Sequence, residues 1–171
     1  MLSTLTTPNK RTKVKIHSNI YNAAYRPFLR SGERTQIFYG GSSSGKSVFL
    51  AQRAINDILQ GGRNYLVCRA VGRTVRKSVF NEIKKVITDF GLSSKFRINK
   101  TDGVITCTNG YQTLFTGLDD AEKLKSITPE KGAITDVWVE EATECKRDSV
   151  KQLMKRQRGG EDSTAKRLVL S

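Results

Sequence analysis

The sequence predicts an α/β fold built on a mostly parallel sheet. Short apolar runs, among them "TQIFY", "NYLVCR" and "RLVL", are typical of strands that are buried on both faces. Segments with helical spacing separate several of these runs, and such alternation favours a parallel sheet flanked by helices. A chain of 171 residues can bury one sizeable core, so we expect a single domain.

The first elements along the chain are a strand and a helix. We interpret residues 1–20 as a basic N-terminal arm and residues 21–171 as the domain itself. The apolar run at residues 35–39 predicts the first strand. Apolar residues recur with a helical period over residues 46–60, which predicts an amphipathic helix that ends at the glycine pair beginning with Gly61.

The middle of the chain predicts a strand, a helix and a hairpin. "NYLVCR", residues 64–69, is the strand. The helix that follows carries apolar residues that step by three or four positions and so share one face: Val75, Val79, Ile83, Val86 and Phe90. In "GVITCTNGYQTLFTG", Asn109 and Gly110 stand between two alternating runs, where this pair favours the type I′ turn of a hairpin.

The last third begins with a polar loop over residues 119–132. An apolar strand follows in "AITDVWVEEA" and ends in two carboxylates. A helix is expected next, carrying Val150, Leu153 and Met154, and a loop over residues 158–164 leads to a final strand in "KRLVLS".

One stretch fits a phosphate-binding loop. The pattern G-x-x-x-x-G-K-[ST] is matched by Gly40, Gly41, Ser42, Ser43, Ser44, Gly45, Lys46 and Ser47. Glycine permits the tight turn and close backbone approach that wrapping a triphosphate requires. Lys46 would reach the β- and γ-phosphates of ATP, and Ser47 would offer its hydroxyl to Mg²⁺ at the positive end of the following helix. The competing interpretation is a flexible linker, which is not expected between a buried strand and an amphipathic helix.

Two adjacent carboxylates, Glu140 and Glu141, lie at the end of a strand. Phosphoryl transfer to water needs a metal and a group that orients the water. The carboxyl end of a strand that neighbours the phosphate-loop strand lies in the same crevice. We assign Glu140 to the Mg²⁺ side and Glu141 to the general base, because adjacent strand residues point in different directions. Asp136 comes too early in the strand and is a weaker metal candidate; an acidic pair at a helix start is the competing explanation.

The charge favours a polyanionic partner. The chain has 30 Lys and Arg against 16 Asp and Glu, a net charge of +14. Lysines that merely solubilise the protein are the alternative. Residues 63–100 hold a concentration of basic side chains that we interpret as a candidate polyanion-facing surface: Arg63, Arg69, Arg73, Arg76, Lys77, Lys84, Lys85, Lys95, Arg97 and Lys100.

Composition also excludes several classes of protein. No apolar run approaches the length of about 18 residues that a membrane span requires, and the basic N-terminus has no secretory signal. The three cysteines are widely separated, which argues against zinc and a disulfide framework. We therefore expect a soluble, intracellular protein.

These motifs resemble those of a known family, the ATPase domain of the large terminase subunit of tailed bacteriophages. The resemblance rests on "YGGSSSGKS", "GLDDAEKLKSI" and "VWVEEATE", and with the order of elements it covers residues 21–171. It implies an additional-strand (ASCE-type) P-loop ATPase fold and ATP with Mg²⁺ as ligands. It implies Lys46 and Ser47 as nucleotide and metal ligands, Glu140 as the Walker B acid and Glu141 as the catalytic glutamate.

The same resemblance implies further roles and partners. The stretch around Tyr21, Tyr25 and Phe28 is similar to the region where such motors hold adenine, although core packing explains these aromatics equally well. Ser171 is similar to the start of the coupling motif that senses the γ-phosphate. The implied partners are double-stranded DNA, portal protein, the small terminase subunit and the procapsid, in the host cytoplasm and away from membranes. A homo-oligomeric ring is implied for the assembled motor and a monomer for the isolated chain.

The sequence departs from the family pattern in three ways. Glu140 stands where many P-loop ATPases have aspartate. A charge-stabilising arginine is not evident, so Lys123, Lys125 and three arginines remain candidates for that role: Arg69, Arg73 and Arg76. Large terminases continue into a nuclease domain whose acidic cluster this chain lacks, so we expect a fragment with no DNA cleavage and with weak or absent ATP hydrolysis.

Two other functions stay open from the sequence. A small-molecule kinase uses the same phosphate loop, but the acidic pair and the large positive charge fit a kinase less well. A DNA-binding module whose nucleotide site is inert in isolation is the second alternative.

Overall fold

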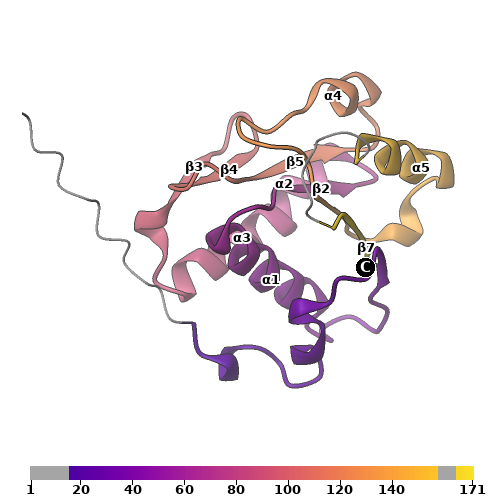
Figure 1. Cartoon of the computed structure of the whole chain (residues 1–171). Coiled ribbons are helices and arrows are strands. Elements are labelled where there is room, and N and C mark those ends of the chain that lie inside the picture. Colours follow the sequence, from indigo (N-terminus) through magenta and orange to yellow (C-terminus); the bar gives the residue numbers. More distant parts are fainter. Residues whose placement is uncertain (1–15, 158–164) are drawn as a thin grey trace, which may run out of the picture.

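The computed structural model describes residues 16–157 and 165–171, in which a seven-stranded sheet lies between two layers of helices (Figure 1). This architecture confirms the expected α/β fold. Most of the basic arm and the loop expected at residues 158–164 lie outside the described residues. The described part of the arm ends in a short 3-10 turn, η1 (Ser18–Ile20).

The sheet is parallel except at one edge. Its order is β1-β7-β6-β2-β5-β4-β3, and only the pairs β5–β4 and β4–β3 are antiparallel. The five parallel strands therefore have their carboxyl ends on the same side of the sheet. The strands are β1 (Thr35–Ile37), β2 (Tyr65–Arg69), β3 (Phe96–Asn99), β4 (Val104–Cys107), β5 (Gln112–Gly117), β6 (Asp136–Val139) and β7 (Arg167–Leu170).

The helices cover both faces of the sheet (Figure 1). The first layer holds α1 (Lys46–Gln60), α2 (Gly72–Lys77) and α3 (Val79–Asp89), and the second holds α4 (Ala121–Ser126) and α5 (Arg147–Arg156). Short 3-10 turns connect elements at η2 (Arg26–Arg30), η3 (Ser93–Lys95) and η4 (Ala142–Glu144). Among the described residues, no helix combines the length and the apolar character needed to cross a membrane.

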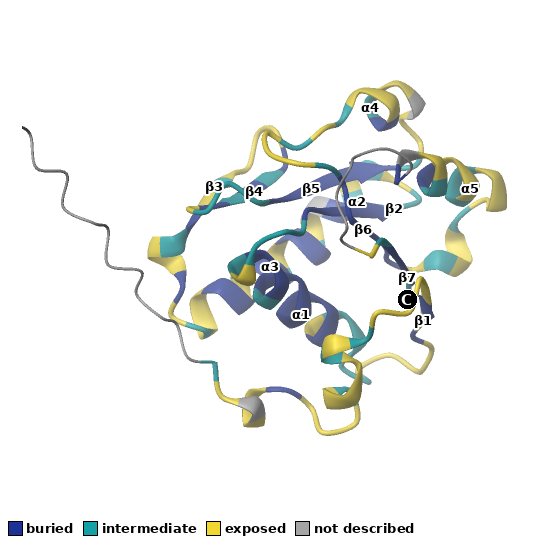
Figure 2. Ribbon diagram, in the orientation of Figure 1, coloured by how far each residue is buried: buried dark blue, intermediate teal, exposed yellow. Residues whose placement is uncertain are grey.

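Two apolar cores result from the alternation of side chains along the strands. In β2, Tyr65 and Val67 pack with the α1 layer, whereas Leu66 and Cys68 pack with the α4 and α5 layer. The central strands are accordingly dark blue in Figure 2, while the outward surfaces of α4 and α5 are mostly yellow. Trp138 is buried on the α1 side, so its strand presents every second residue to that layer.

The helix expected after the second strand is interrupted, which corrects the prediction of one continuous helix. Ser78 has φ −107° and ψ −91° and separates α2 from α3. Its hydroxyl donates to the Thr74 carbonyl at 2.9 Å and accepts from Arg69 Nη1 at 3.2 Å. Serine competes for backbone hydrogen bonds in this way and so weakens a helix interior.

Three further local features can be compared with expectation. The hairpin between β4 and β5 is confirmed, but the expected type I′ turn is wrong, because Gly110 has φ +90° whereas Asn109 does not have the positive φ that this turn needs. The prediction of a polar loop at residues 119–132 is wrong in part, because the short helix α4 lies within this segment. The Asp120 side chain accepts a hydrogen bond from Lys123 N and caps that helix. The edge strand β3 was not predicted, since only two of its four residues are apolar.

The order of strands corrects one step of the sequence argument. The strand that ends at the acidic pair, β6, is not a direct neighbour of β1, because β7 pairs with both and lies between them. An inserted strand of this kind is what the additional-strand fold requires. The end of β7, at Ser171, therefore lies between the phosphate loop and the acidic pair.

Candidate functional site

The loop between β1 and α1 has the backbone conformation of a tight, glycine-dependent turn. Gly40 and Gly45 have φ of +152° and +82°, in a region that L side chains rarely adopt. Gly45 is the N-cap of α1, so the N–H groups of the first helical turn point toward the loop. Ser43 also has a positive φ of 64°, which is uncommon for a residue other than glycine.

Lys46 folds back over this loop. Its ammonium donates to the carbonyls of Gly40 at 2.7 Å and Gly41 at 3.2 Å, and to the Ser44 hydroxyl at 3.1 Å. The lysine charge, the loop amides and the positive end of the 15-residue helix α1 converge in one place. This arrangement attracts anions, and polyphosphate in particular.

The structure brings Ser47 and Glu140 together. The Ser47 hydroxyl, in the first turn of α1, donates to Oε1 of Glu140 just beyond β6. Glu140 is 8% exposed, so its side chain is buried beside the first turn of α1. In residues 16–157 and 165–171 no group of three or more His, Cys, Asp or Glu could hold a metal ion by itself.

The other oxygen of Glu140 is held by two further donors. Oε2 accepts from the indole N–H of Trp138 at 3.0 Å and from the hydroxyl of Ser171 at 2.5 Å. Trp138 is also a buried residue of the core on the α1 side. The signal that identifies its contact is the i, i+2 spacing, which puts both side chains on the same face of β6.

Glu141 points away from this cluster of donors. Its backbone is left-handed, with φ 52° and ψ 53°, and its side chain is 52% exposed. Oε1 of Glu141 lies 2.9 Å from Nη2 of Arg69, which ends β2, and the same nitrogen lies 3.7 Å from Glu144. A strained left-handed residue at a strand end is typical of functional sites, where backbone strain concentrates.

The three aromatics expected near adenine have different environments. Tyr21 is 5% exposed and packs edge-on against Phe90, which gives its ring a packing role in the core. Tyr25 lies against the loop: its hydroxyl donates to the Ser44 carbonyl at 3.1 Å and its ring stacks on Phe49. Phe28 is 44% exposed at the surface.

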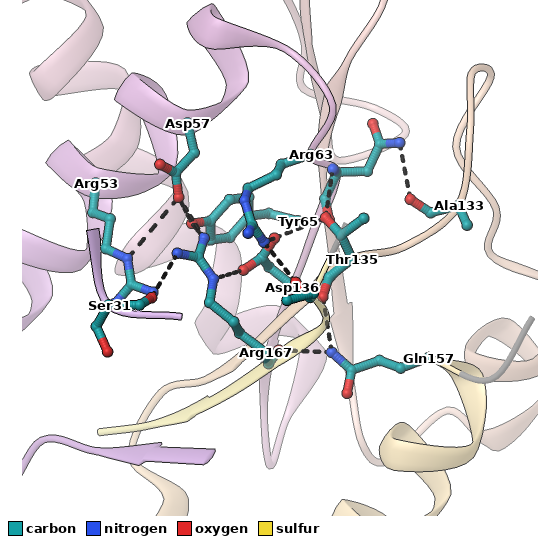
Figure 3. A network of polar contacts seen from close by, with 12 residues as sticks. Ser31, Arg53, Asp57, Arg63, Tyr65, Ala133, Thr135, Asp136, Gln157 and Arg167 are labelled. Atoms are coloured by element: carbon teal, nitrogen blue, oxygen red, sulfur yellow. Dashed lines mark hydrogen bonds and ion pairs between the residues drawn. The ribbon is translucent and has the colours of Figure 1, made fainter. Parts of the chain in front are cut away.

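Asp136 is the first residue of β6, so it lies at the amino ends of the parallel strands, where it belongs to the polar network of Figure 3. Its carboxylate pairs with Nε of Arg167 and, at 3.0 Å, with Nη1 of Arg63. Arg167 also bonds Asp57 and the hydroxyl of Tyr65. Asp136 is therefore engaged in a buried ion-pair network, and the weak expectation that it binds metal is wrong.

This buried network ties α1 to three strands. Burial alone would lower the pKa of Arg167, but Tyr65, Asp136 and Asp57 outweigh it and raise that pKa. Burial, reinforced by the two aspartates, raises the pKa of the Tyr65 phenol well above its ordinary value. The network fixes the amino ends of β2, β6 and β7, and so holds in register the strands whose other ends carry the candidate site.

The basic segment at residues 63–100 does not form one free surface. Arg63 and Arg69 are committed to the ion pairs with Asp136 and Glu141. Among the members whose side chains the structure describes, the exposed ones are Arg73, Lys77, Lys85, Arg97 and Lys100. A groove of about 460 Å³ opens between α2 and α4, lined by Arg73, Lys77 and Lys123 on its basic side and by Asp119 and Asp120. Among the candidates whose side chains the structure describes, the arrangement singles out no charge-stabilising finger; these are Arg69, Arg73, Lys123 and Lys125.

The comparison with protein families decides the identity. A family model described as phage terminase large subunit matches residues 32–171. The chain belongs to the phage terminase large subunit family. The matched region of this terminase chain contains the phosphate loop, the acidic strand end and the inserted strand β7.

Two curated relatives agree with this assignment. The PBSX phage terminase large subunit of Bacillus subtilis (strain 168) is 31% identical over 138 residues, which cover 80% of this chain and 31% of that protein. The large terminase subunit of Bacillus phage SPP1 is 32% identical over 111 residues, which cover 64% of this chain and 26% of that protein. The chain thus spans less than a third of the length of these relatives.

A solved structure has the same fold. The large terminase of a thermophilic bacteriophage in complex with ADP superposes with a TM-score of 0.59 at 15% identity, over 80% of this chain and 33% of that one. At this identity the likeness concerns the fold alone. It confirms the additional-strand P-loop fold that the sequence predicted.

Proposed function

We propose that this chain is the ATPase module of a phage DNA-packaging motor, which binds Mg-ATP in the P-loop and couples its hydrolysis to the translocation of double-stranded DNA into a procapsid. The observation that carries the proposal is the contact between Ser47 of the loop helix and Glu140 of the acidic strand end. Membership of the terminase family supports it. The ADP bound in the terminase of the thermophilic phage supports nucleotide as the ligand.

The loop residues hold the phosphates in this proposal. The backbone amides of residues 40–47 would bind the α- and β-phosphates. The Lys46 ammonium would give up its hydrogen bonds to the Gly40 and Gly41 carbonyls and bind the β- and γ-phosphates instead. Tyr25 borders the loop and is the better placed of the two tyrosines to contact adenine, because Tyr21 is buried.

Ser47 and Glu140 fit Mg²⁺. The hydroxyl of Ser47 and the carboxylate of Glu140 are hydrogen-bonded to each other and both offer the oxygen ligands that Mg²⁺ prefers. In ATPases Mg²⁺ takes its other ligands from phosphates and water. When bound there, Mg²⁺ would neutralise phosphate charge as it develops in the transition state. Glu140 keeps one carboxylate oxygen directed at Ser47 and therefore at this position.

Glu141 orients the attacking water and accepts its proton. Its exposed carboxylate follows Glu140 directly, and its left-handed backbone turns it away from the Ser47 side. Arg69 forms an ion pair with this carboxylate. To reach a water beside the γ-phosphate, Glu141 therefore has to break the ion pair or move together with the Arg69 side chain.

The proposal also includes DNA and the partners of the assembled motor. We propose that exposed basic residues on and near α2 contact DNA phosphates, and that portal protein, the small subunit and neighbouring copies in a ring complete the motor. Hydrolysis by the isolated chain is expected to be weak, because a neighbouring subunit would supply the missing positive charge to the γ-phosphate.

Nucleotide binding by calorimetry tests the proposal. The wild-type chain should bind ATP more tightly with Mg²⁺ than without it, and Lys46→Ala should weaken binding at least tenfold, about 1.4 kcal/mol. Lys100→Ala, at an exposed lysine outside the loop, is the control and should bind normally. Failure of wild type to bind Mg-ATP would refute the proposal, and phosphorylation of a small acceptor would favour a kinase instead.

A further inference from the structure

We propose that Trp138 is a positioning residue that, together with Ser171, sets the orientation of the Glu140 carboxylate on the metal side of the site. The inference rests on the proposed function, because orientation matters only if Glu140 serves bound Mg²⁺. It concerns a tryptophan that would otherwise count as core packing.

The contacts around Glu140 are divided between its two oxygens. Oε1 accepts from Ser47 alone among the contacts described above. Oε2 accepts from the Trp138 indole at 3.0 Å and from the Ser171 hydroxyl at 2.5 Å. The indole N–H also lies 3.0 Å from the Ser171 oxygen, so the three groups form a closed triangle.

This division fixes the carboxylate plane. A carboxylate on a glutamate side chain turns freely about its last bond unless donors hold both oxygens. Trp138 of β6 and Ser171, the residue after β7, hold Oε2 and therefore leave Oε1 directed at the first turn of α1. Partners of this kind orient metal ligands, and their loss typically weakens metal binding by about 10- to 100-fold.

Packing explains the size of Trp138 but not its polar atom. Trp138 is 1% exposed and packs on the α1 side of β6, where the apolar part of the ring is enough to fill space. A buried indole N–H without an acceptor costs about 1–3 kcal/mol. Here the acceptor is the carboxylate of the candidate metal ligand, so the polar end of the side chain is tied to the site.

The clamp also provides a built-in optical signal. Trp138 is the only tryptophan of the chain, so all tryptophan emission comes from the group that touches Glu140. Binding of Mg-nucleotide that draws Glu140 toward the metal would change the hydrogen bond at the indole nitrogen. The emission of the wild-type protein should therefore change with Mg-ATP and respond less to ATP in EDTA.

Trp138→Phe tests the inference, because phenylalanine keeps an aromatic ring and removes the N–H. We expect the Mg²⁺ concentration for half-maximal enhancement of ATP binding, measured by calorimetry, to rise about tenfold, while ATP affinity in EDTA stays unchanged. Ser171→Ala removes the second donor and should raise the same requirement.

The control is Phe115→Leu, which alters another buried aromatic on the α1 side of the sheet. Phe115→Leu should lower thermal stability and leave the Mg²⁺ requirement unchanged. If the effect of Trp138→Phe were purely structural, that variant would behave in the same way. If Trp138→Phe does not fold, the Ser171→Ala titration and the wild-type emission carry the test.

The outcomes separate the two proposals. The positioning role is overturned if folded Trp138→Phe binds Mg-ATP with an unchanged Mg²⁺ requirement. It is also overturned if Ser171→Ala has an unchanged requirement and the emission of the wild type does not change with Mg-ATP. Absence of any Mg-ATP binding by the wild-type chain overturns the proposed function and this inference with it.

Discussion

The hydroxyl of Ser47 donates a hydrogen bond to Oε1 of Glu140, 93 positions later in the chain. The contact joins the first turn of α1 to the end of β6, although β7 separates β6 from β1 in the sheet. It is possible because α1 lies on the same face as Trp138 and Val169, across the inserted strand. The phosphate loop and the acidic strand end are therefore parts of one site.

Glu141→Gln should separate binding from turnover. The amide cannot accept a proton from water, so we expect phosphate release to fall about 100-fold or more, while ATP affinity measured by calorimetry changes little. Glu144→Gln is a matched control, because Glu144 is similarly exposed and also lies near Arg69. Full activity of Glu141→Gln, or an equal loss in Glu144→Gln, would remove Glu141 from this role.

Charge reversal on α2 should weaken DNA binding. Arg73 and Lys77 are exposed and four positions apart, so they lie on one side of the helix. Replacing both by glutamate should reduce the slope of log affinity against log salt by about 0.9 per lost phosphate contact. Arg147→Glu with Lys155→Glu, at exposed positions on α5, changes net charge equally and should leave more of the slope. Equal slopes for the two pairs would exclude α2 as the DNA-contact surface.

Asp136→Asn should destabilise the fold. The change leaves Arg63 and Arg167 with less negative charge in a buried site, which costs about 3–5 kcal/mol. A thermal unfolding scan should show a Tm lowered by roughly 6–20 °C. Asp148→Asn is the control, because its carboxylate is 89% exposed and pairs with Lys151 at the surface. A shift no larger than that of the control would mean that the network contributes little to stability.

Tyr65 should make stability depend on alkaline pH. Its pKa is raised in the folded state, whereas the unfolded phenol titrates near 10.0. Below that pH both states keep the proton and the stabilisation is complete; as the pH rises above it, the unfolded state loses its proton first and stability falls. Urea unfolding midpoints of the wild type should therefore decrease above about pH 10.

Tyr65→Phe should flatten this dependence. It should also lower stability at neutral pH by about 2 kcal/mol, because the bonds to Asp57 and Arg167 are lost. Tyr39→Phe, at a tyrosine that is 91% exposed, should leave the profile unchanged. If the urea midpoint of Tyr65→Phe falls above about pH 10 as steeply as that of the wild type, the pH dependence comes from other groups.

The sequence predicted those parts of the fold that depend on local patterns. The glycine and lysine of the loop follow from what phosphate demands of the backbone, and the hairpin at Gly110 follows from turn chemistry. The break at Ser78 could not be predicted, because it depends on a hydrogen bond from Arg69, nine positions earlier on another element.

The site was predictable as a set of residues but not as an arrangement. Ser47 and Glu140 were expected to serve one metal, yet their contact depends on the inserted strand, whose place in the sheet no local pattern reveals. Nothing in the sequence separates Trp138 from an ordinary core residue, because an indole is apolar over most of its surface; the role of its N–H follows from its contact with Glu140. Arg69 was one candidate among several basic residues until its pairing with Glu141 was seen.

A double-mutant cycle between Ser47 and Glu140 tests the central claim most directly. ATP affinity with and without Mg²⁺ would be measured by calorimetry for wild type, Ser47→Ala, Glu140→Gln and the double variant. If the two residues form one metal site, each single change removes most of the Mg²⁺ enhancement and the double variant loses little more. Additive losses, or an enhancement that survives in both single variants, would contradict the account.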